Sequence, residues 1–252
     1  MGEISDMRTI KKGSLLDESF FRGICHRGLH NQEFTENGLK AFQNAIDHGM
    51  AFELDIHLTK DNVLLVCHDE ELVRTTGKKG IIEDLTAAEI RENYRLLDGE
   101  VVPTFQEVLD LNQERSLIVV ELKTFRKNYF QLGKAARKLL DERIKNPKKI
   151  AIISFDPRAL MAFRKGPYHR ALLICKEKEF AWGWRWCSES LDLEWFMAKE
   201  PRVISYRKKG KGVNVWTIQT EEQLKEIAPY VDTVTFEYLD PELVTKTLEE
   251  NG

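Results

Sequence analysis

The sequence has few of the features that mark disulfide-rich, membrane-spanning or secreted proteins. Its four cysteines include no Cys-x-x-Cys pair, which argues against a zinc ribbon and fits reduced thiols packed in a core. No apolar run approaches the roughly 18 residues of a membrane span, and the N-terminus has no unbroken apolar stretch of the kind a secretory signal needs. We therefore expect a cytoplasmic location.

The chain also lacks an excess of either charge. Thirty-eight Lys and Arg residues stand against forty-one Asp and Glu, a formal net charge of −3. Such a balance gives no bulk attraction to nucleic acid or to anionic lipid. We expect a small-molecule substrate, with neither nucleic acid nor a membrane surface as partner, and the oligomeric state stays open. A phosphate site remains compatible with this composition, because it needs only local positive charge.

Short β-branched runs alternate with helical patterns along most of the 252 residues, and this alternation predicts βαβ units with a parallel sheet. Eight strands close a (β/α)₈ TIM barrel, which is typically about 250 residues long. We therefore predict an α/β protein in which residues 1–252 form a single TIM-barrel domain. The expected barrel strands are 22–26, 51–58, 117–122, 150–155, 170–175, 190–195, 213–218 and 233–238.

One departure from simple alternation follows the second strand. The strand-like run 51–58 is followed by Asp61-Asn62 and a second run ending at His68, which predicts a β-hairpin. A two-residue turn at Asp61-Asn62 would place Asp55 opposite His68. The next segment, about 69–100, is then a small insertion over the barrel mouth.

Three carboxyl groups are expected at the ends of neighbouring strands. Glu53 and Asp55 share one face of the second strand, because side chains alternate along a strand. Glu121 ends the third barrel strand, and active sites of TIM barrels form at this carboxyl end. Carboxylate oxygens are the ligands that Mg²⁺ and Ca²⁺ prefer. The sequence therefore predicts a site for one of these divalent cations.

Two histidines and two positively charged residues are expected at the same end of the barrel as the three carboxyl groups. His26 ends the first strand and His68 ends the hairpin, so the two imidazoles could divide the roles of general acid and general base. Arg27 and Lys123 could hold an anionic oxygen group. Together with the carboxylates, this set is typical of metal-assisted phosphoryl chemistry.

The motifs that carry these residues resemble the glycerophosphodiester phosphodiesterase family, in order and spacing, from about residue 22 to residue 240. The matching pieces are His26-Arg27-Gly28, Glu36-Asn37, Glu53-Leu54-Asp55, Leu58-Thr59-Lys60-Asp61, His68-Asp69, Arg74-Thr75-Thr76, Pro103-Thr104, Glu121-Leu122-Lys123, Ser154-Phe155-Asp156 and Val213-Asn214-Val215-Trp216. The combination is specific, although each piece alone is not.

The resemblance implies an activity and a role for each matching residue. Proteins of this family cleave glycerophosphodiesters to sn-glycerol 3-phosphate and an alcohol, with a cyclic phosphate intermediate expected by similarity. By the same similarity His26 and His68 are the acid/base pair, and Arg27 and Lys123 hold the phosphate. Mg²⁺ or Ca²⁺ would be bound by Glu53, Asp55 and Glu121.

Two other functions stay open from the sequence. One is a lysophospholipase D type activity, for which the aromatic segment from Phe180 to Phe196 would bind an acyl chain. The other is a non-catalytic barrel that binds a phospho-ligand, against which the two intact histidines argue. For the aromatic segment we favour packing of helix against barrel. Phe155 and Trp216, at strand ends, are better candidates for contacting the glycerol carbons.

The chain departs from the family pattern at three places. Gly38 follows Glu36-Asn37 where Thr is usual, and Thr35 precedes them where Pro is usual. Glu237 stands in the last strand where aspartate is usual, and the stretch 180–202 diverges. Among the other histidines, we expect a structural partner for His57 and solvent around His30.

Overall fold

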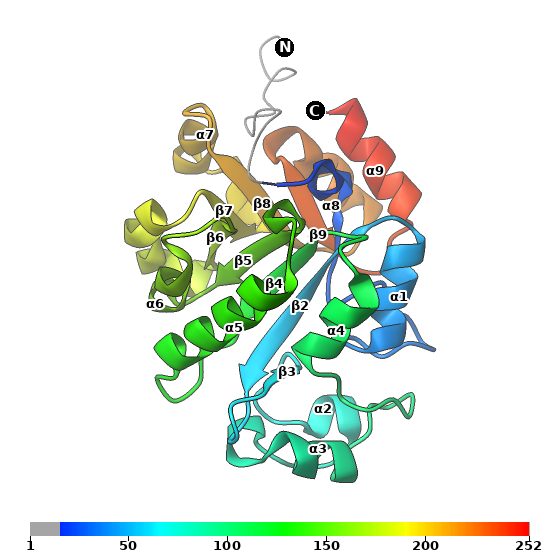
Figure 1. Ribbon diagram of the computed structural model, residues 1–252. Helices are drawn as coiled ribbons and strands as arrows, with labels where there is room; N and C mark the ends of the chain where they lie inside the picture. Colours follow the sequence, from blue (N-terminus) through cyan, green and yellow to red (C-terminus); the bar gives the residue numbers. More distant parts are fainter. Residues whose placement is uncertain (1–15, 252) are drawn as a thin grey trace.

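The computed structural model describes residues 16–251, and its centre is a closed barrel of parallel strands (Figure 1). The strands pair in the order β1-β9-β8-β7-β6-β5-β4-β2, and β1 also pairs with β2, which closes the ring. This arrangement confirms the predicted (β/α)₈ barrel. The barrel strands are β1 (Ile24–Cys25), β2 (Ala51–Leu58), β4 (Ile118–Leu122), β5 (Ile150–Ser154), β6 (His169–Ile174), β7 (Ser190–Glu194), β8 (Gly212–Ile218) and β9 (Thr233–Phe236).

Strand alternation divides the core into two layers. Outward side chains such as Phe52, Leu54 and Val120 pack under the surrounding helices. Inward side chains such as Val119 and Ile153 fill the barrel, which the short helix η1 (Glu18–Arg22) closes at its amino end with Phe20. Because Glu53 and Asp55 alternate with Phe52 and Leu54, their carboxyl groups point into the barrel, as the sequence predicted.

Helices cover the outside of the ring, and their ends match local sequence signals. Thr86, Thr104 and Thr220 each begin a helix with a reciprocal capping box, in which the cap hydroxyl and the side chain three residues later exchange backbone hydrogen bonds. The α-helices are α1 (Leu39–Asp47), α2 (Val73–Thr76), α3 (Ala87–Asn93), α4 (Phe105–Asn112), α5 (Tyr129–Arg143), α6 (Pro157–Leu160), α7 (Pro201–Arg207), α8 (Glu221–Ile227) and α9 (Pro241–Glu250).

Short 3-10 segments connect several of these elements. They are η2 (Ile82–Asp84), η3 (Pro147–Lys149), η4 (Met161–Phe163), η5 (Lys176–Cys187), η6 (Trp195–Lys199) and η7 (Ala228–Tyr230).

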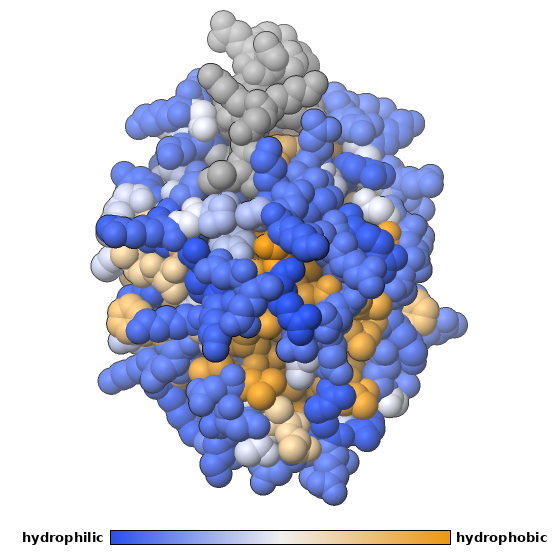
Figure 2. All heavy atoms as spheres, in the orientation of Figure 1, coloured by the Kyte–Doolittle hydropathy of each residue, from blue (hydrophilic) through white to orange (hydrophobic). Residues whose placement is uncertain are grey.

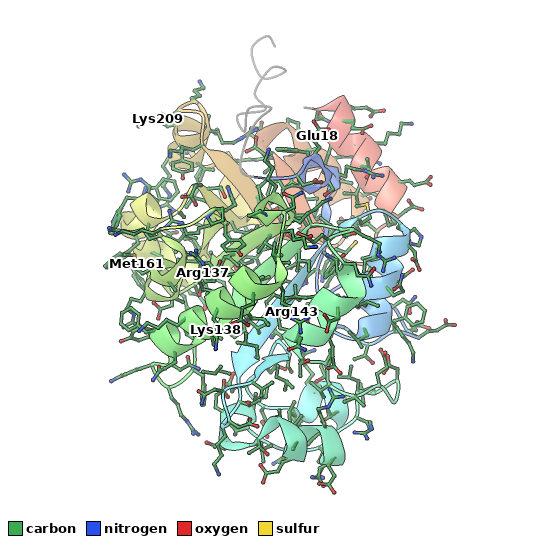
Figure 3. The ribbon with its side chains drawn as sticks, in the orientation of Figure 1. Glu18, Arg137, Lys138, Arg143, Met161 and Lys209 are labelled. Atoms are coloured by element: carbon green, nitrogen blue, oxygen red, sulfur yellow. The ribbon has the colours of Figure 1, made fainter. Side chains whose placement is uncertain are left out.

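The outer face of the helix layer is hydrophilic, with apolar side chains visible between the helices (Figure 2). Lys138 and Arg143 on α5 point outward from the barrel (Figure 3), and the Arg143 guanidinium reaches Asp110 of α4 at 3.1 Å. None of the helices within residues 16–251 combines the length and the apolar character needed to span a bilayer.

The segment between β2 and α4 leaves the ring and lies beyond the carboxyl end of β2 (Figure 1). The antiparallel strand β3 (Leu64–Val66) pairs with β2, and α2, η2 and α3 follow it. These elements enclose a small core of their own, which includes Leu72, Ile82 and Ile90. The segment is therefore held at the end of the barrel where strand-end side chains converge.

The pairing of β2 with β3 corrects the predicted hairpin register. Ile56 pairs with Val66 and Leu58 with Leu64, so Asp55 lies opposite Cys67, whose amide donates to the Asp55 carbonyl at 3.1 Å. The loop has three residues, 60–62, and its last residue, Asn62, is left-handed with φ 63°. Three-residue hairpin loops commonly end in this conformation, and the extra residue shifts every pair by one.

Candidate active site

Three buried carboxylates meet at the carboxyl ends of β2 and β4. Oxygen atoms of Glu53, Asp55 and Glu121 all lie within 4.8 Å of one another. The register explains this, because Asp55 pairs directly with Glu121 between the two strands. Among the described residues, Asp55 Oδ1 has no hydrogen-bond donor and is shielded from solvent. The cluster therefore offers several oxygen ligands in the small volume that a hard divalent cation requires.

Crowding three carboxylates away from water perturbs their protonation. Burial, followed by the charges of Asp55 and Glu121, raises the pKa of Glu53 well above its ordinary value. Burial opposes ionisation of Asp55 too, but Lys123 and Arg27 hold its pKa well below the ordinary range. Unequal pKa values in one cluster are typical of functional sites, where charge is concentrated for a ligand.

Lys123 and Arg27 lie against these carboxylates. Lys123 Nζ is 2.9 Å from Glu121 Oε1 and 3.5 Å from Asp55 Oδ1. Arg27 Nε is 3.5 Å from Asp55 Oδ2, and the Arg27 backbone amide donates to Glu53 Oε2 at 3.0 Å. Both positively charged side chains therefore lie at the rim of the carboxylate cluster, where they can also contact an anionic ligand bound there.

His26 is oriented by Glu237, the residue that departs from the usual aspartate. His26 Nδ1 lies 2.5 Å from Glu237 Oε1, and its Nε2 lies 4.0 Å from Glu53 Oε2. Although burial opposes it, hydrogen bonds from His26 and His30 lower the pKa of Glu237, so this carboxyl is ionised. A carboxylate at Nδ1 holds the proton there and leaves Nε2 free toward the cluster.

His30 is not surrounded by solvent, contrary to the expectation from its loop position. Its Nε2 lies 3.5 Å from Glu237 Oε1, its side chain is 9% exposed, and its ring contacts Tyr238 edge to face. The sequence could not indicate this contact, because residues 30 and 237 meet only through closure of the barrel between β1 and β9.

His68 reaches the same site although the hairpin is shifted by one residue. Strand β3 ends at Val66, so the chain after it is free to turn, and His68 lines the cavity beside the carboxylates. His57 Nε2 lies 3.1 Å from the His68 carbonyl oxygen, and His57 Nδ1 lies 2.7 Å from Glu83. His57 therefore has the structural partners that the sequence predicted.

The imidazole of His68 is paired with the neighbouring carboxylate. Its Nδ1 lies 2.6 Å from Asp69 Oδ1, while burial lowers the pKa of the imidazole against the attraction of Asp55. Both site histidines thus have a carboxylate at Nδ1, and within residues 16–251 neither Nε2 is held by a hydrogen bond, an arrangement suited to proton transfer at Nε2.

A chain of ion pairs connects the two histidine loops. Arg74 donates to Asp69 at 2.6 Å and to both carboxylate oxygens of Glu36 at 2.7 and 2.9 Å. Glu36 in turn accepts from Arg27 at 2.8 Å. The neighbouring Asn37 donates to Asp55 Oδ2 at 2.9 Å. The sequence analysis named Glu36, Asn37, Asp69 and Arg74 only as motif pieces, and the structure shows what each of them holds.

Gly38 has a local reason to replace the usual Thr. A Cβ atom at this position would approach the Thr35 carbonyl oxygen and the Glu100 carboxylate, each to 2.9 Å. The turn before α1 is therefore packed too closely for a side chain at residue 38.

The cavity beside the carboxylates has a volume of about 120 Å³, and most of its charged side chains lie on one side. The charged side carries the site histidines, Arg27 and the carboxylates. The opposite side, from β5 to β9, carries Phe155 and Trp216, packed edge to face at 5.7 Å between ring centroids. It also carries residues that sequence reasoning missed, namely Ile153, Leu173, Asp192, Thr217 and Thr235.

The aromatic segment after β6 corrects the packing expectation. Trp182 is half-buried, and its ring centroid lies 5.9 Å from that of Tyr206 on α7. The other aromatic side chains are exposed: Phe180 by 77%, Trp184 by 45%, Trp186 by 63% and Phe196 by 47%. The segment η5 is a 3-10 helix with a kink at Lys178, so only part of it faces the barrel. Periodicity alone could not identify that kink.

The model of the Glycerophosphoryl diester phosphodiesterase family matches residues 26–238. The chain belongs to this family. The predicted family is therefore confirmed, and with it the enzyme class, a phosphodiesterase.

Relatives in sequence carry the same name. The chain is 28% identical to a glycerophosphodiester phosphodiesterase of Caldanaerobacter subterraneus over 91% of this chain and 98% of that protein. It is 32% identical to a glycerophosphodiester phosphodiesterase of Bacillus altitudinis over 60% of this chain and 64% of that protein. A lysophospholipase D of Homo sapiens is 44% identical over 76 residues, which is 24% of that protein.

Solved structures of the family share the fold. A glycerophosphodiester phosphodiesterase of Thermotoga maritima superposes with a TM-score of 0.70 and 29% identity, over 87% of this chain and 94% of the other. An Oleispira antarctica phosphodiesterase, solved with sn-glycerol-3-phosphate, superposes with a TM-score of 0.76 and 22% identity, over 90% and 95% of the two chains.

Proposed function

We propose that this protein hydrolyses glycerophosphodiesters to sn-glycerol 3-phosphate and an alcohol. The single observation that carries the proposal is the buried carboxylate cluster, with its oxygens within 4.8 Å, beside two histidines and Arg27 in one cavity and with Lys123 against its carboxylates. Family membership and the product bound in the Oleispira antarctica protein support the same substrate class.

The carboxylate cluster fits one divalent cation, Mg²⁺ or Ca²⁺, held by Glu53, Asp55 and Glu121. The fit rests on the shielded Asp55 Oδ1, which accepts no hydrogen bond from the described residues, and on a set of ligands made only of carboxylate oxygens. A cation bound there supplies charge neutralisation of the phosphodiester and lowers the pKa of a nearby hydroxyl.

The side chains of this protein bind the phosphate and transfer the protons. Arg27 and Lys123 bind the phosphate oxygens and orient the phosphorus. One of His26 and His68 removes the proton of the attacking glycerol 2-hydroxyl at Nε2, and the other delivers a proton to the departing alkoxide. Water then opens the resulting cyclic phosphate to give sn-glycerol 3-phosphate, with the two histidines exchanging roles. Glu237 and Asp69 hold the Nδ1 protons of these rings. Phe155 and Trp216 contact the glycerol carbons and exclude water.

We further propose that residues 1–252 act as one cytoplasmic catalytic domain with the insertion 69–100 over the mouth.

The exposed side chains of Phe180 and Trp186 favour a second candidate, a lysophospholipase D type activity in which they contact an acyl chain.

One assay tests the proposed function. Release of sn-glycerol 3-phosphate from glycerophosphocholine, glycerophosphoethanolamine and glycerophosphoglycerol is measured after chelation and after return of Mg²⁺ or Ca²⁺. We expect loss of activity in chelator and recovery with the cation. Full activity after thorough chelation would contradict the carboxylate site, and choline release from lysophosphatidylcholine alone would favour the second candidate.

A further inference from the structure

The side of the cavity away from the carboxylates holds an unexpected buried acid. TIM-barrel interiors are mostly filled by Val, Ile and Leu, and Ile153 and Leu173 follow this rule on β5 and β6. On the next strand, however, Asp192 points inward at 2% exposure and lines the cavity. Burying a carboxyl group among apolar side chains is unfavourable unless something binds it.

Asp192 is held in place but is not fully bonded. Asn214 is its partner in the pairing of β7 with β8, contacts its side chain, and in turn donates to Thr235 at 2.9 Å. Among residues 16–251, Asp192 Oδ1 finds no hydrogen-bond partner and is shielded from solvent. The barrel therefore fixes the position of one carboxyl oxygen that has no hydrogen-bond partner in the described part of the chain.

A second polar atom in the same cavity also has no hydrogen-bond partner among the described residues. Trp216 lines the cavity next to Phe155, and its indole Nε1 is buried without an acceptor in the described part of the chain. An N–H donor and a carboxyl oxygen are the two kinds of partner that a hydroxyl group uses, because it accepts one hydrogen bond and donates another. Because buried polar groups are nearly always paired, the pair points to a hydroxylated ligand.

We propose that Asp192 and Trp216 Nε1 bind the terminal hydroxyl of the substrate glycerol and thereby select deacylated glycerophosphodiesters. This inference rests on the proposed function. If the phosphate lies at the cation site and the 2-hydroxyl lies beside it, the terminal hydroxyl is the glycerol group farthest from phosphorus. Ile153, Leu173 and Phe155 cover the intervening carbons.

The chemistry of the terminal oxygen supports the same selection. An acyl ester at this oxygen lacks the hydroxyl proton and therefore cannot donate a hydrogen bond to the Asp192 carboxylate. Burial raises the pKa of Asp192 to about 7, and either protonation state can bond a hydroxyl, as donor or as acceptor.

A substrate pair that differs by one hydroxyl tests the inference. Kinetics of sn-glycero-3-phosphocholine are compared with those of the propane-1,2-diol analogue, which keeps the 2-hydroxyl and lacks the terminal one. A site built to bond a hydroxyl rejects the analogue strongly, and we expect kcat/KM to fall by about 10²-fold or more. Equal values for the two substrates would overturn the inference.

Variants then assign the preference to the two residues. Trp216→Phe keeps the ring and removes the N–H, Asp192→Leu removes both oxygens, and Asp192→Asn restores a polar partner. We expect the first two to reduce the preference about tenfold or more, and Asp192→Asn to retain part of it. Trp184→Phe and Asp110→Leu, on the exposed surface, are matched controls that keep it. An unchanged preference in both cavity variants would refute the assignment.

Binding without turnover separates this inference from the proposed function. Calorimetry compares sn-glycerol 3-phosphate with propane-1,2-diol phosphate on the wild-type protein, in the presence of Mg²⁺ or Ca²⁺. Tighter binding of the glycerol compound supports the inference even if no diester is hydrolysed, a result that would sink the proposed function alone. Equal binding of both compounds contradicts the hydroxyl site, as would hydrolysis of lysophosphatidylcholine at the rate of glycerophosphocholine.

Discussion

His68 and His48 form a matched pair of histidines within one chain. His68 lines the cavity beside the carboxylates, whereas His48 follows α1 on the surface, where its Nδ1 bonds the Asn44 carbonyl oxygen at 2.8 Å. We predict that His68→Ala lowers kcat by roughly 10² to 10⁴, the usual contribution of a general acid or base. His48→Ala should leave kcat unchanged.

The same assay on His26→Ala should give a loss of similar size, since both rings have a carboxylate at Nδ1. Circular dichroism and the unfolding temperature serve as the check that the variants are folded. Wild-type turnover in a folded His68→Ala protein would remove His68 from the reaction, together with the proposed role of Asp69.

Lys123 separates phosphate binding from cation binding. Its ammonium group contacts Glu121 and Asp55, so its positive charge competes with a cation for these oxygens. We predict that Lys123→Met costs the transition state about 2–4 kcal/mol, as expected for the loss of a preorganised anion-stabilising donor. The cation affinity measured by calorimetry should stay equal or become tighter.

Lys127, exposed in the same loop, is the control for Lys123, and Lys127→Met should change neither quantity. If Lys123→Met weakened the cation affinity and kept normal turnover at saturating cation, Lys123 would support the carboxylates instead. Its proposed contact with phosphate would then have to be abandoned.

At the scale of elements, the pairing of β6 with β7 buries a titratable ring at the amino end of the barrel. His169 is 5% exposed and bonds Ser190 Oγ at 2.7 Å, close to the charges of Glu189 and Arg170. Burial lowers the pKa of His169 to about 4 from its ordinary 6.5. The folded protein therefore keeps this ring neutral at a pH where the unfolded chain protonates it.

Stability should fall as the pH decreases from about 6.5 toward 4, because only the unfolded state gains the proton in that window. Between pH 7 and pH 5 the loss is about 2 kcal/mol, from a shift of this size at 1.36 kcal/mol per pKa unit. Urea unfolding of the wild type and of His169→Gln, which does not titrate, measures it. Parallel pH dependence in the two proteins would contradict the assignment.

At the scale of the whole molecule, a cation at the carboxylate cluster should stabilise the folded state, because the three ligands converge only after barrel closure. Binding to the folded state alone contributes about 2.7 kcal/mol when the free cation is 100 times its dissociation constant. For a protein of this size we predict a rise in Tm of roughly 5–10 °C, measured by calorimetry with Mg²⁺ or Ca²⁺ and with chelator.

The variant Glu121→Gln should lose most of that rise. Glu142→Gln, on the exposed face of α5, should retain it fully. The same Tm in chelator and in saturating cation would show that no cation binds the folded protein at this site.

Local sequence patterns determined the barrel and the chemical identity of the site. The capping boxes at Thr86, Thr104 and Thr220 depend on contacts a few residues apart. The strand ends follow local patterns too, and they are as predicted to within about two residues. Alternation along β2 was sufficient to place Glu53 and Asp55 on one inward face, because the period of a strand is two.

Only the tertiary structure decided the contacts that cross the barrel. The pairing of His26 with Glu237 joins residues 211 positions apart, and the inward orientation of Asp192 matters only because β7 faces the carboxylates across a closed ring. The hairpin register depended on whether Asn62 adopts a left-handed conformation, and the exposure of Phe180 depended on the kink in η5. A linear pattern specifies which side chains a strand presents, whereas closure, loop conformation and packing decide what those side chains meet.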